Sequence, residues 1–133
     1  MNFQVIYFSR KGSTKKIADA IASELKVEAE DVKNAKLDTS AFVFLGSGNY
    51  GGKPAREMIQ FIEENNFKNV ALFGTSGGGE GNEVEEMQKL IYEKNGKVTG
   101  TFFCKGKFGF INRKKPSDKD IEEAKKFASD MKK

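Results

Sequence analysis

The sequence predicts a single α/β domain built on a parallel sheet. Its 133 residues suit one domain with one core. Short apolar runs alternate with segments of helical periodicity, and three of the runs are continuously apolar. Continuous runs are typical of parallel strands that helices cover on both faces. The pattern therefore indicates a parallel sheet between two helical layers, joined by right-handed crossovers.

Five strands and four helices account for the pattern. Strands are predicted at residues 3–8, 27–32 (the weakest), 41–45, 69–73 and 98–103. Helices are predicted from apolar residues at helical spacing: Ile17, Ala18, Ile21, Ala22 and Leu25; Ala55, Met58, Ile59 and Ile62; Val84, Met87, Leu90 and Ile91; Ile121, Ala124, Ala128 and Met131.

Local signals set the helix ends. Pro54 stands where the second helix begins, and Asn82 is the predicted N-cap of the third. Asn95 and Gly96 end the third helix, and Pro116-Ser117 opens the fourth. Residues 33–40 are too few for a crossover helix, so we expect the second strand to lie at an edge with an irregular connection.

Composition excludes several kinds of chemistry. The chain has no histidine and one cysteine, Cys104, so zinc sites, Ser-His-Asp catalysis and an internal disulfide are not expected. Cys104 ends an apolar strand and is predicted to be a small buried hydrophobe. No apolar run approaches a membrane span, and Met1 leads almost directly into a strand. We therefore expect a cytoplasmic protein, with no membrane association.

The positive charge is concentrated near the carboxyl end. Residues 104–133 carry ten basic and five acidic side chains, whereas the whole chain has a net charge of +4. The basic residues that precede the last helix are Lys105, Lys107, Arg113, Lys114 and Lys115. This stretch is either a solvated loop or a docking surface for an acidic partner. The neighbouring phenylalanines belong in part to a strand, so nucleic-acid binding is not expected.

Ten of the 14 glycines fall in three clusters, each directly after an apolar run. The clusters lie at residues 9–14, 46–52 and 74–81. Glycine and hydroxyl residues at strand ends let a backbone approach a small molecule and offer it N–H donors. The three clusters therefore predict one ligand site at the carboxyl edge of the sheet.

The first cluster, Ser9-Arg10-Lys11-Gly12-Ser13-Thr14, runs into a helix predicted from Thr14. Free amides, hydroxyls and the helix dipole at such a point favour a phosphate. Neither a dinucleotide-binding Gly-x-Gly-x-x-Gly nor a nucleoside-triphosphatase loop is present after the first strand. Taken alone, the segment is equally consistent with an ordinary capped turn.

Together the three clusters resemble the flavin-binding loops of flavodoxins. Residues 9–14 resemble the phosphate loop [Ser/Thr]-x-Thr-Gly-x-Thr, residues 46–52 the loop that carries an aromatic ring onto the flavin, and residues 73–81 the third loop. The likeness covers the whole chain, residues 1–133, in order and spacing. It implies a flavodoxin-like three-layer sandwich with a five-stranded sheet of order 2-1-3-4-5, and FMN as the cofactor.

The resemblance also implies roles for individual residues. Ser9, Arg10, Lys11, Gly12, Ser13 and Thr14 would hold the FMN phosphate. Tyr50 would stack on the flavin ring and the Gly51 peptide would face it, within a loop of Ser47, Gly48, Asn49, Tyr50, Gly51 and Gly52. The third loop would line the ring's pyrimidine edge, through Gly74, Thr75, Ser76, Gly77, Gly78, Gly79 and Gly81.

Three departures from the family pattern stand out. Lys11 replaces a threonine of the phosphate loop, and the third loop lacks its usual Tyr or Trp, which leaves one flavin face thinly covered. The chain is also basic, with a sequence pI near 9.1, where typical flavodoxins are acidic. Fewer acids near the flavin would make it less strongly reducing, because Coulomb repulsion of the reduced anion is weaker.

The resemblance implies a monomeric one-electron carrier that shuttles between redox enzymes. Two alternatives stay open: an FMN-dependent reductase or its flavin subunit, which would use the uncovered flavin face, and an apo flavodoxin-fold interaction module.

Overall fold

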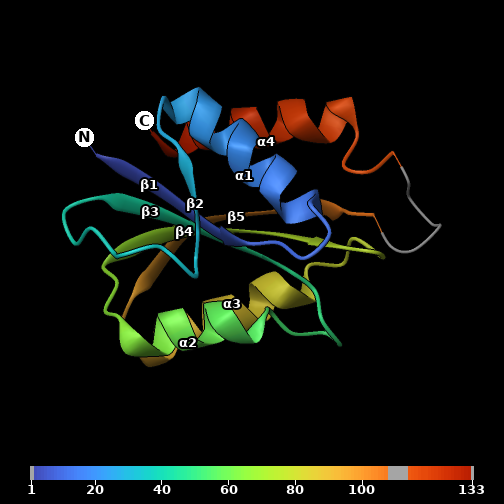
Figure 1. Cartoon of the computed structure of the whole chain (residues 1–133). Helices are drawn as coiled ribbons and strands as arrows, with labels where there is room; N and C mark the ends of the chain where they lie inside the picture. Colours follow the sequence, from blue (N-terminus) through green and yellow to red (C-terminus); the bar gives the residue numbers. More distant parts are fainter. Residues whose placement is uncertain (1, 108–113, 133) are drawn as a thin grey trace.

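The computed structural model describes residues 2–107 and 114–132, and strands and helices alternate through most of them (Figure 1). The elements are β1 (Phe3–Phe8), α1 (Ser13–Leu25), β2 (Ala29–Asp31), β3 (Phe42–Gly48), α2 (Arg56–Glu64), β4 (Asn69–Ser76), α3 (Asn82–Glu93), β5 (Lys97–Lys105) and α4 (Asp118–Met131).

The five strands form one parallel sheet in the order β2-β1-β3-β4-β5, which confirms the predicted class and order. Neighbouring ends stay in register, since Phe8 pairs with Ser47 and Ser47 with Gly74. The loops that follow β1, β3 and β4 therefore leave the sheet side by side, at the right of Figure 1.

Helices cover both faces of the sheet: α1 and α4 lie on one side, and α2 and α3 on the other (Figure 1). The strands bury residues in both directions, with Phe44 and Phe73 facing the α1–α4 side and Leu45 and Leu72 facing the α2–α3 side. All four are 0% exposed. This double coverage explains why the central strands are continuously apolar.

The strands that approach the site are longer than predicted. β3 continues to Gly48, β4 to Ser76 and β5 to Lys105, beyond their apolar runs. Pairing between strands, rather than side-chain polarity, decides where they end, because Gly48 pairs with Thr75 and Ser76 with Lys105. The glycine clusters thus begin inside the sheet.

The second strand is a short edge strand, as expected, and no helix connects it to β3. It is shorter than the predicted 27–32. The side chain of Gln4 secures the irregular connection: its amide donates to the carbonyl of Lys36 at 2.8 Å, and its carbonyl accepts from the N–H of Asp38 at 2.9 Å.

Two helix starts differ from the predictions. α1 begins at Ser13, one residue early. The prediction that Asn82 caps α3 is wrong: Gly81 is the N-cap, with φ of 80°, and Asn82 is the first helical residue. A left-handed turn before the helix suits glycine, and it moves the start by one position. At α4 the Ser117 signal is confirmed, because Ser117 and Asp120 form a reciprocal capping box.

Candidate cofactor site at the carboxyl ends of the strands

The three glycine clusters meet around one pocket of about 370 Å³. A volume of this size lies within the usual range for small-molecule sites. Of the residues predicted to bind the cofactor, the following line it: Ser9, Arg10, Lys11, Ser13, Thr14, Gly48, Asn49, Tyr50, Gly51, Thr75, Ser76 and Gly77. Clusters that are far apart in the sequence therefore build a single site.

The first loop is shaped by a left-handed glycine. Gly12 has φ of 97°, and its N–H donates to the hydroxyl oxygen of Ser9 at 3.0 Å. The Gly12 carbonyl accepts the first bond of α1, from the N–H of Lys16. Amides of the first turn of a helix have no partner within that helix. Ser13 and Thr14, in the first turn of α1, line the pocket, so the positive end of the helix lies beside it.

Two hydroxyls of the first loop also join it to the other side of the pocket. The hydroxyls of Thr14 and Thr75 lie 2.8 Å apart and are buried. The Ser13 hydroxyl oxygen accepts from the N–H of Lys107 at 2.9 Å, so its hydrogen stays available to a ligand. These contacts fix the first loop to the ends of β4 and β5.

Gly106 and Lys107 also line the pocket, and sequence reasoning did not assign them to it. Gly106 is buried, and a Cβ there would lie 3.0 Å from Cβ of Ser13 and 3.1 Å from Cβ of Thr75. A larger residue would therefore push these walls apart. In the sequence these residues belong only to a short Lys-Gly-Lys segment after the last predicted strand. They reach the pocket because β5 pairs with β4 in the register that sets Cys104 beside Thr75.

The Tyr50 ring stands at the mouth of the pocket and is half-buried. Its edge packs against Phe8, with ring centroids 6.0 Å apart at 80°. The guanidinium of Arg10 lies 4.6 Å from the ring centroid, a cation–π distance. The ring also packs against the core on the α2–α3 side of the sheet. Tyr50 is therefore held in place before any ligand binds.

The Tyr50 hydroxyl points back into the first loop. A Cβ on Gly48 would lie 2.8 Å from that hydroxyl oxygen, so a larger residue there would displace the Tyr50 side chain. Burial raises the pKa of Tyr50, and the facing backbone N–H of Arg10 lowers it in part. The hydroxyl therefore occupies space beside an amide that the resemblance assigns to phosphate.

The turn that carries Tyr50 is tightly braced. The N–H of Tyr50 donates to the Lys53 carbonyl at 2.8 Å, and the N–H of Gly52 donates to the Asn49 side chain at 2.8 Å. Gly51 and Gly52 have φ of 68° and 88°, which side chains rarely tolerate. The third loop is braced in the same way, because the N–H of Gly79 donates to the Ser76 hydroxyl at 2.8 Å.

Seven predicted residues lie behind or beside the pocket rather than in its lining: Gly12, Ser47, Gly52, Gly74, Gly78, Gly79 and Gly81. Ser47 is fully buried, and its hydroxyl donates to the Gly48 carbonyl and accepts from the N–H of Ala55. Gly74 leaves room for the side chain of Glu83, whose Oε2 a Cβ at residue 74 would overlap. These residues shape the loops.

Three cationic side chains line the pocket: those of Arg10, Lys11 and Lys107. Among the described residues, no carboxylate lines it. Farther out, Lys105 and Lys114 are exposed, and Lys115 lies 3.6 Å from Asp120. Arg113, part of the predicted basic stretch, lies outside the described residues. The site therefore favours an anionic ligand.

Cys104 is 9% exposed, which agrees with its prediction as a buried side chain. Burial raises the pKa of its thiol to about 12. Such a thiol stays protonated and is a poor nucleophile.

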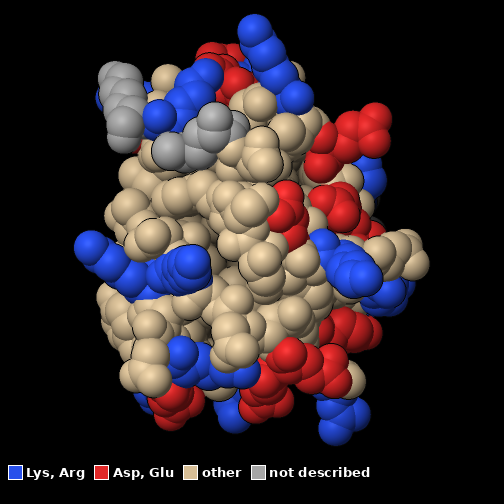
Figure 2. Space-filling model, turned by 90° about the vertical axis from the view of Figure 1, so that its left-hand side faces the viewer, with Lys and Arg blue, Asp and Glu red and all other residues tan. Residues whose placement is uncertain are grey.

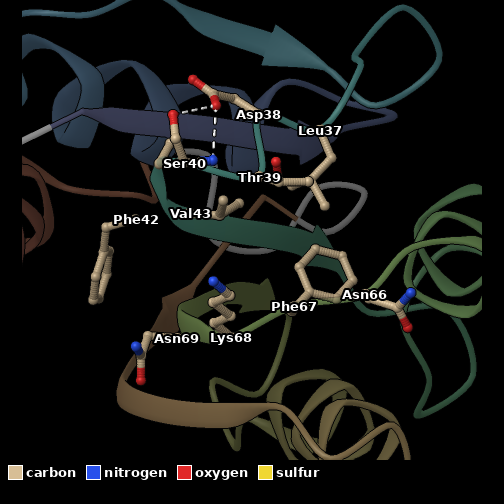
Figure 3. A pocket seen from close by; sticks show the side chains of 11 residues that line it. Leu37, Asp38, Thr39, Ser40, Phe42, Val43, Asn66, Phe67, Lys68 and Asn69 are labelled. Carbon is tan, nitrogen blue, oxygen red and sulfur yellow. Dashed lines mark hydrogen bonds between the residues drawn. The ribbon is translucent and has the colours of Figure 1, made fainter.

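A hollow at the opposite end of the sheet differs in character. It lies between the connection that precedes β3 and the loop that precedes β4, beside Leu37, Val43 and Phe67 (Figure 3). Its carboxylate, Asp38, already accepts from the N–H and the hydroxyl of Ser40. On this face, charged side chains gather around the edge and uncharged residues occupy the centre (Figure 2). Lys68 is the one cation among the described residues that line this hollow, against three cations in the pocket at the other end.

Within residues 2–107 and 114–132, no group of three or more His, Cys, Asp or Glu side chains could hold a metal ion. None of the helices in this part of the chain has the length and apolar character to cross a membrane.

Comparison with known proteins agrees with this geometry. The chain is 33% identical over 119 residues to the flavodoxin-like domain-containing protein BilS of Clostridioides difficile (strain CD3), across 80% of this chain and 67% of that protein. Its fold matches a flavodoxin from the domain Archaea, with a TM-score of 0.79, 24% identity and coverage of 98% and 96%.

A short-chain flavodoxin associated with a non-canonical PDU bacterial microcompartment has the same fold, with a TM-score of 0.77, 15% identity and coverage of 97% and 95%. Residues 4–115 match the flavodoxin domain family itself, which is most of the chain. On the sequence match and the fold together, the chain belongs to the flavodoxin domain family.

Proposed function

We propose that this protein binds FMN in the pocket between the three loops and serves as a one-electron carrier. The observation that carries the proposal is the meeting, in one pocket, of the α1 amino terminus, three cations and the Tyr50 ring. Bound FMN would supply the redox chemistry, and the protein would supply position and electrostatics.

The donor set matches the two ends of such a ligand. The amides of Ser13 and Thr14 and the cations of Arg10, Lys11 and Lys107 suit a phosphate. The Tyr50 ring and the small residues Gly48, Gly51 and Gly77 suit a flat ring that approaches the backbone closely.

Titration of the purified protein with FMN, followed by quenching of flavin fluorescence, tests the proposal. We expect one molecule to bind per chain. Riboflavin, which has the ring without the phosphate, is the matched control and should bind at least tenfold more weakly, since it loses the charge-assisted bonds. Absence of FMN binding would leave the apo interaction module as the better description.

One observation favours the reductase alternative. The third loop carries no aromatic ring, and the half-exposed Ser76 and Gly77 form the pocket wall at that point. A substrate would therefore reach a flavin face that an aromatic side chain would otherwise cover. Anaerobic mixing of the FMN-loaded protein with NADH or NADPH distinguishes the two: rapid bleaching of the flavin absorbance supports a reductase, and two resolved one-electron steps in a dithionite titration support a carrier.

We also propose that the partner surface is basic and accepts an acidic redox protein. Arg10, Lys11 and Lys107 line the pocket, and exposed Lys105 and Lys114 extend the positive charge beyond it. Opposite charges on a partner would raise the encounter rate, and salt would lower it. The predicted docking residues are Lys105, Lys107, Arg113, Lys114 and Lys115.

Small acceptors of opposite charge test the sign of this surface. Ferricyanide, an anion, should reoxidise the reduced protein at a rate that falls as salt increases, while the cation hexaammineruthenium should show the reverse. Lys107→Glu should slow the ferricyanide reaction severalfold. Lys68→Glu, at the opposite end of the sheet, makes the same charge change and should leave the rate unaltered. Equal salt dependence for both acceptors would contradict a basic docking surface.

A further inference from the structure

A glutamate side chain is sealed behind the pocket wall. Glu83 lies in the first turn of α3 and is 0% exposed. One carboxyl oxygen accepts from the side-chain amide of Asn49 at 3.0 Å, and the other is the one buried side-chain polar atom in the described residues without a hydrogen-bond partner. Acidic side chains are almost never fully buried unless they are paired, so this placement is costly and calls for an explanation.

The partner of Glu83 belongs to the turn that carries Tyr50. Asn49 donates to Glu83 through its amide nitrogen, and its amide oxygen accepts from the N–H of Gly52. The bond from Gly52 to Asn49 closes the turn around Tyr50 and Gly51, which line the pocket as Asn49 does. The side chain of Asn49 therefore ties the turn of residues 49–52 to the first turn of α3.

The rest of the carboxyl rests on the sheet. Its Oε2 and Cδ fill the space where a Cβ of residue 74 would stand, so Gly74 is required for Glu83 to fit. The next residue along β4, Thr75, lines the pocket. Glu83 thus contacts two of the three loops, at Asn49 of the second and at Gly74 of the third.

The groups around this carboxyl are neutral or acidic. Asn49 faces it from the turn after β3 and Gly74 from β4, and the thiol of Cys104 on β5 is close enough to respond to its charge. Burial raises the pKa of Glu83, hydrogen bonds from the Asn49 side chain and from the backbone N–H of Glu83 itself lower it, and the charges of Glu80 and Glu85 raise it further. Protonation is therefore easier here than on an exposed glutamate.

We propose that Glu83 is a positioning residue for the ligand site, which holds the turn of residues 49–52 through Asn49 and takes up a proton from solvent when negative charge enters the pocket. The proposal rests on the proposed function, because the charge in question is that of bound FMN and of the electrons it receives. The proton binds to the carboxylate, and no bond of the ligand is altered. An added negative charge near a buried carboxylate favours its neutral form.

Four variants separate the hydrogen bond from the charge. Glu83→Gln keeps an oxygen for Asn49 but cannot ionise, whereas Glu83→Leu loses both properties. Asn49→Ala removes the other end of the same bond. Glu93→Gln removes an exposed acid of the same helix, one that does not act on the pKa of Glu83, and is the matched charge control.

Affinity for FMN tests the positioning role. Glu83→Leu and Asn49→Ala should each weaken FMN binding about tenfold, the effect expected for one hydrogen bond to a buried acidic group. The double variant should be no weaker than Asn49→Ala alone, because Asn49→Ala already removes the bond to Glu83. Glu83→Gln should restore binding to within about twofold at pH 7. Unchanged affinity in Glu83→Leu and Asn49→Ala would overturn the positioning role.

The pH dependence of the flavin midpoint potential tests the proton role. The wild-type protein and Glu93→Gln should share one pH profile, and Glu83→Gln should lack the inflection that Glu83 contributes. Identical profiles for wild type and Glu83→Gln would overturn the proton role, even if the affinities behave as expected.

A readout without FMN separates failure of this proposal from failure of the proposed function. The side-chain carboxyl signal of Glu83, followed by NMR in the apo protein, should titrate above the ordinary range of glutamate. If wild type binds no FMN but this signal titrates high, the proposed function fails and the buried proton site stands. If FMN binds and the signal titrates in the ordinary range, the proton role fails alone.

Discussion

Tyr50 shows how one side chain can both prepare a site and obstruct it. Its ring is placed by Phe8 and Arg10, yet its hydroxyl lies beside Gly48 and faces the backbone N–H of Arg10. An amide that faces the hydroxyl is less available to an incoming phosphate. Removing the hydroxyl and removing the ring should therefore have different effects on ligand binding.

We expect Tyr50→Phe to bind FMN as tightly as wild type or severalfold more tightly, because the ring is kept and the Arg10 amide is released. Tyr50→Ala should bind about tenfold more weakly, since it loses the aromatic contact. Fluorescence titrations of the two variants under identical conditions measure both constants. If Tyr50→Phe loses as much affinity as Tyr50→Ala, the hydroxyl rather than the ring holds the ligand.

Cys104 supports a second prediction at this scale. Its thiol is buried and has a pKa raised to about 12, so the reactive thiolate is scarce at pH 8. Iodoacetamide should leave the folded protein unmodified for hours and label Cys104 rapidly in denaturant, as mass spectrometry would detect. Labelling of the folded protein at the rate of a free thiol would show that the strand end opens readily.

At the scale of elements, the helix starts show what sequence signals can and cannot convey. Ser117 and Asp120 were readable as a cap because the interaction is local, three residues apart. Asn82 was misread because the conformation of Gly81, not the presence of a capping side chain, decides where α3 begins. That conformation in turn places Glu83 against β4, a contact between elements with no local signature.

The capping box of α4 has a measurable value. The Ser117 hydroxyl accepts from the N–H of Asp120 at 3.2 Å, and the Asp120 carboxylate accepts from the N–H of Ser117 at 2.8 Å. Ser117→Ala should lower the free energy of unfolding by about 1 kcal/mol. Ser117→Thr, which keeps a hydroxyl, should lose much less. Urea denaturation of the three proteins measures the difference, and equal losses would mean that the box contributes nothing.

At the scale of the whole molecule, the sheet order, the layers and the location of the site could be predicted from the sequence. The alternation of apolar runs and helical segments predicted the layers, and the resemblance to flavodoxins predicted the strand order. The glycine clusters predicted where the site lies. The contribution of Gly106 and Lys107 to the pocket could not be predicted, because it depends on how β5 pairs with β4. The division of glycines into pocket walls and supports depends likewise on packing, as Gly74 and Glu83 show.

The buried carboxyl should also make the stability of the whole fold depend on pH. The pKa of Glu83 is raised in the folded protein, so the native state binds its proton more tightly than the unfolded chain. This contribution to stability is fully present below the ordinary glutamate pKa. It is lost as pH rises through the folded pKa, at about 1.4 kcal/mol for each unit by which the pKa is raised.

Glu83→Gln removes this dependence and keeps the shape of the side chain. Relative to wild type, it should gain stability steadily as pH rises above about 4.5, and the gain should level off once the pH exceeds the folded pKa. Urea denaturation of the apo proteins between pH 4 and 8, with Glu93→Gln as the exposed control, measures the difference. A constant difference between wild type and Glu83→Gln across that range would mean that the carboxyl is ionised in the folded protein as readily as in the unfolded chain. Its burial would then impose no pH dependence on the fold.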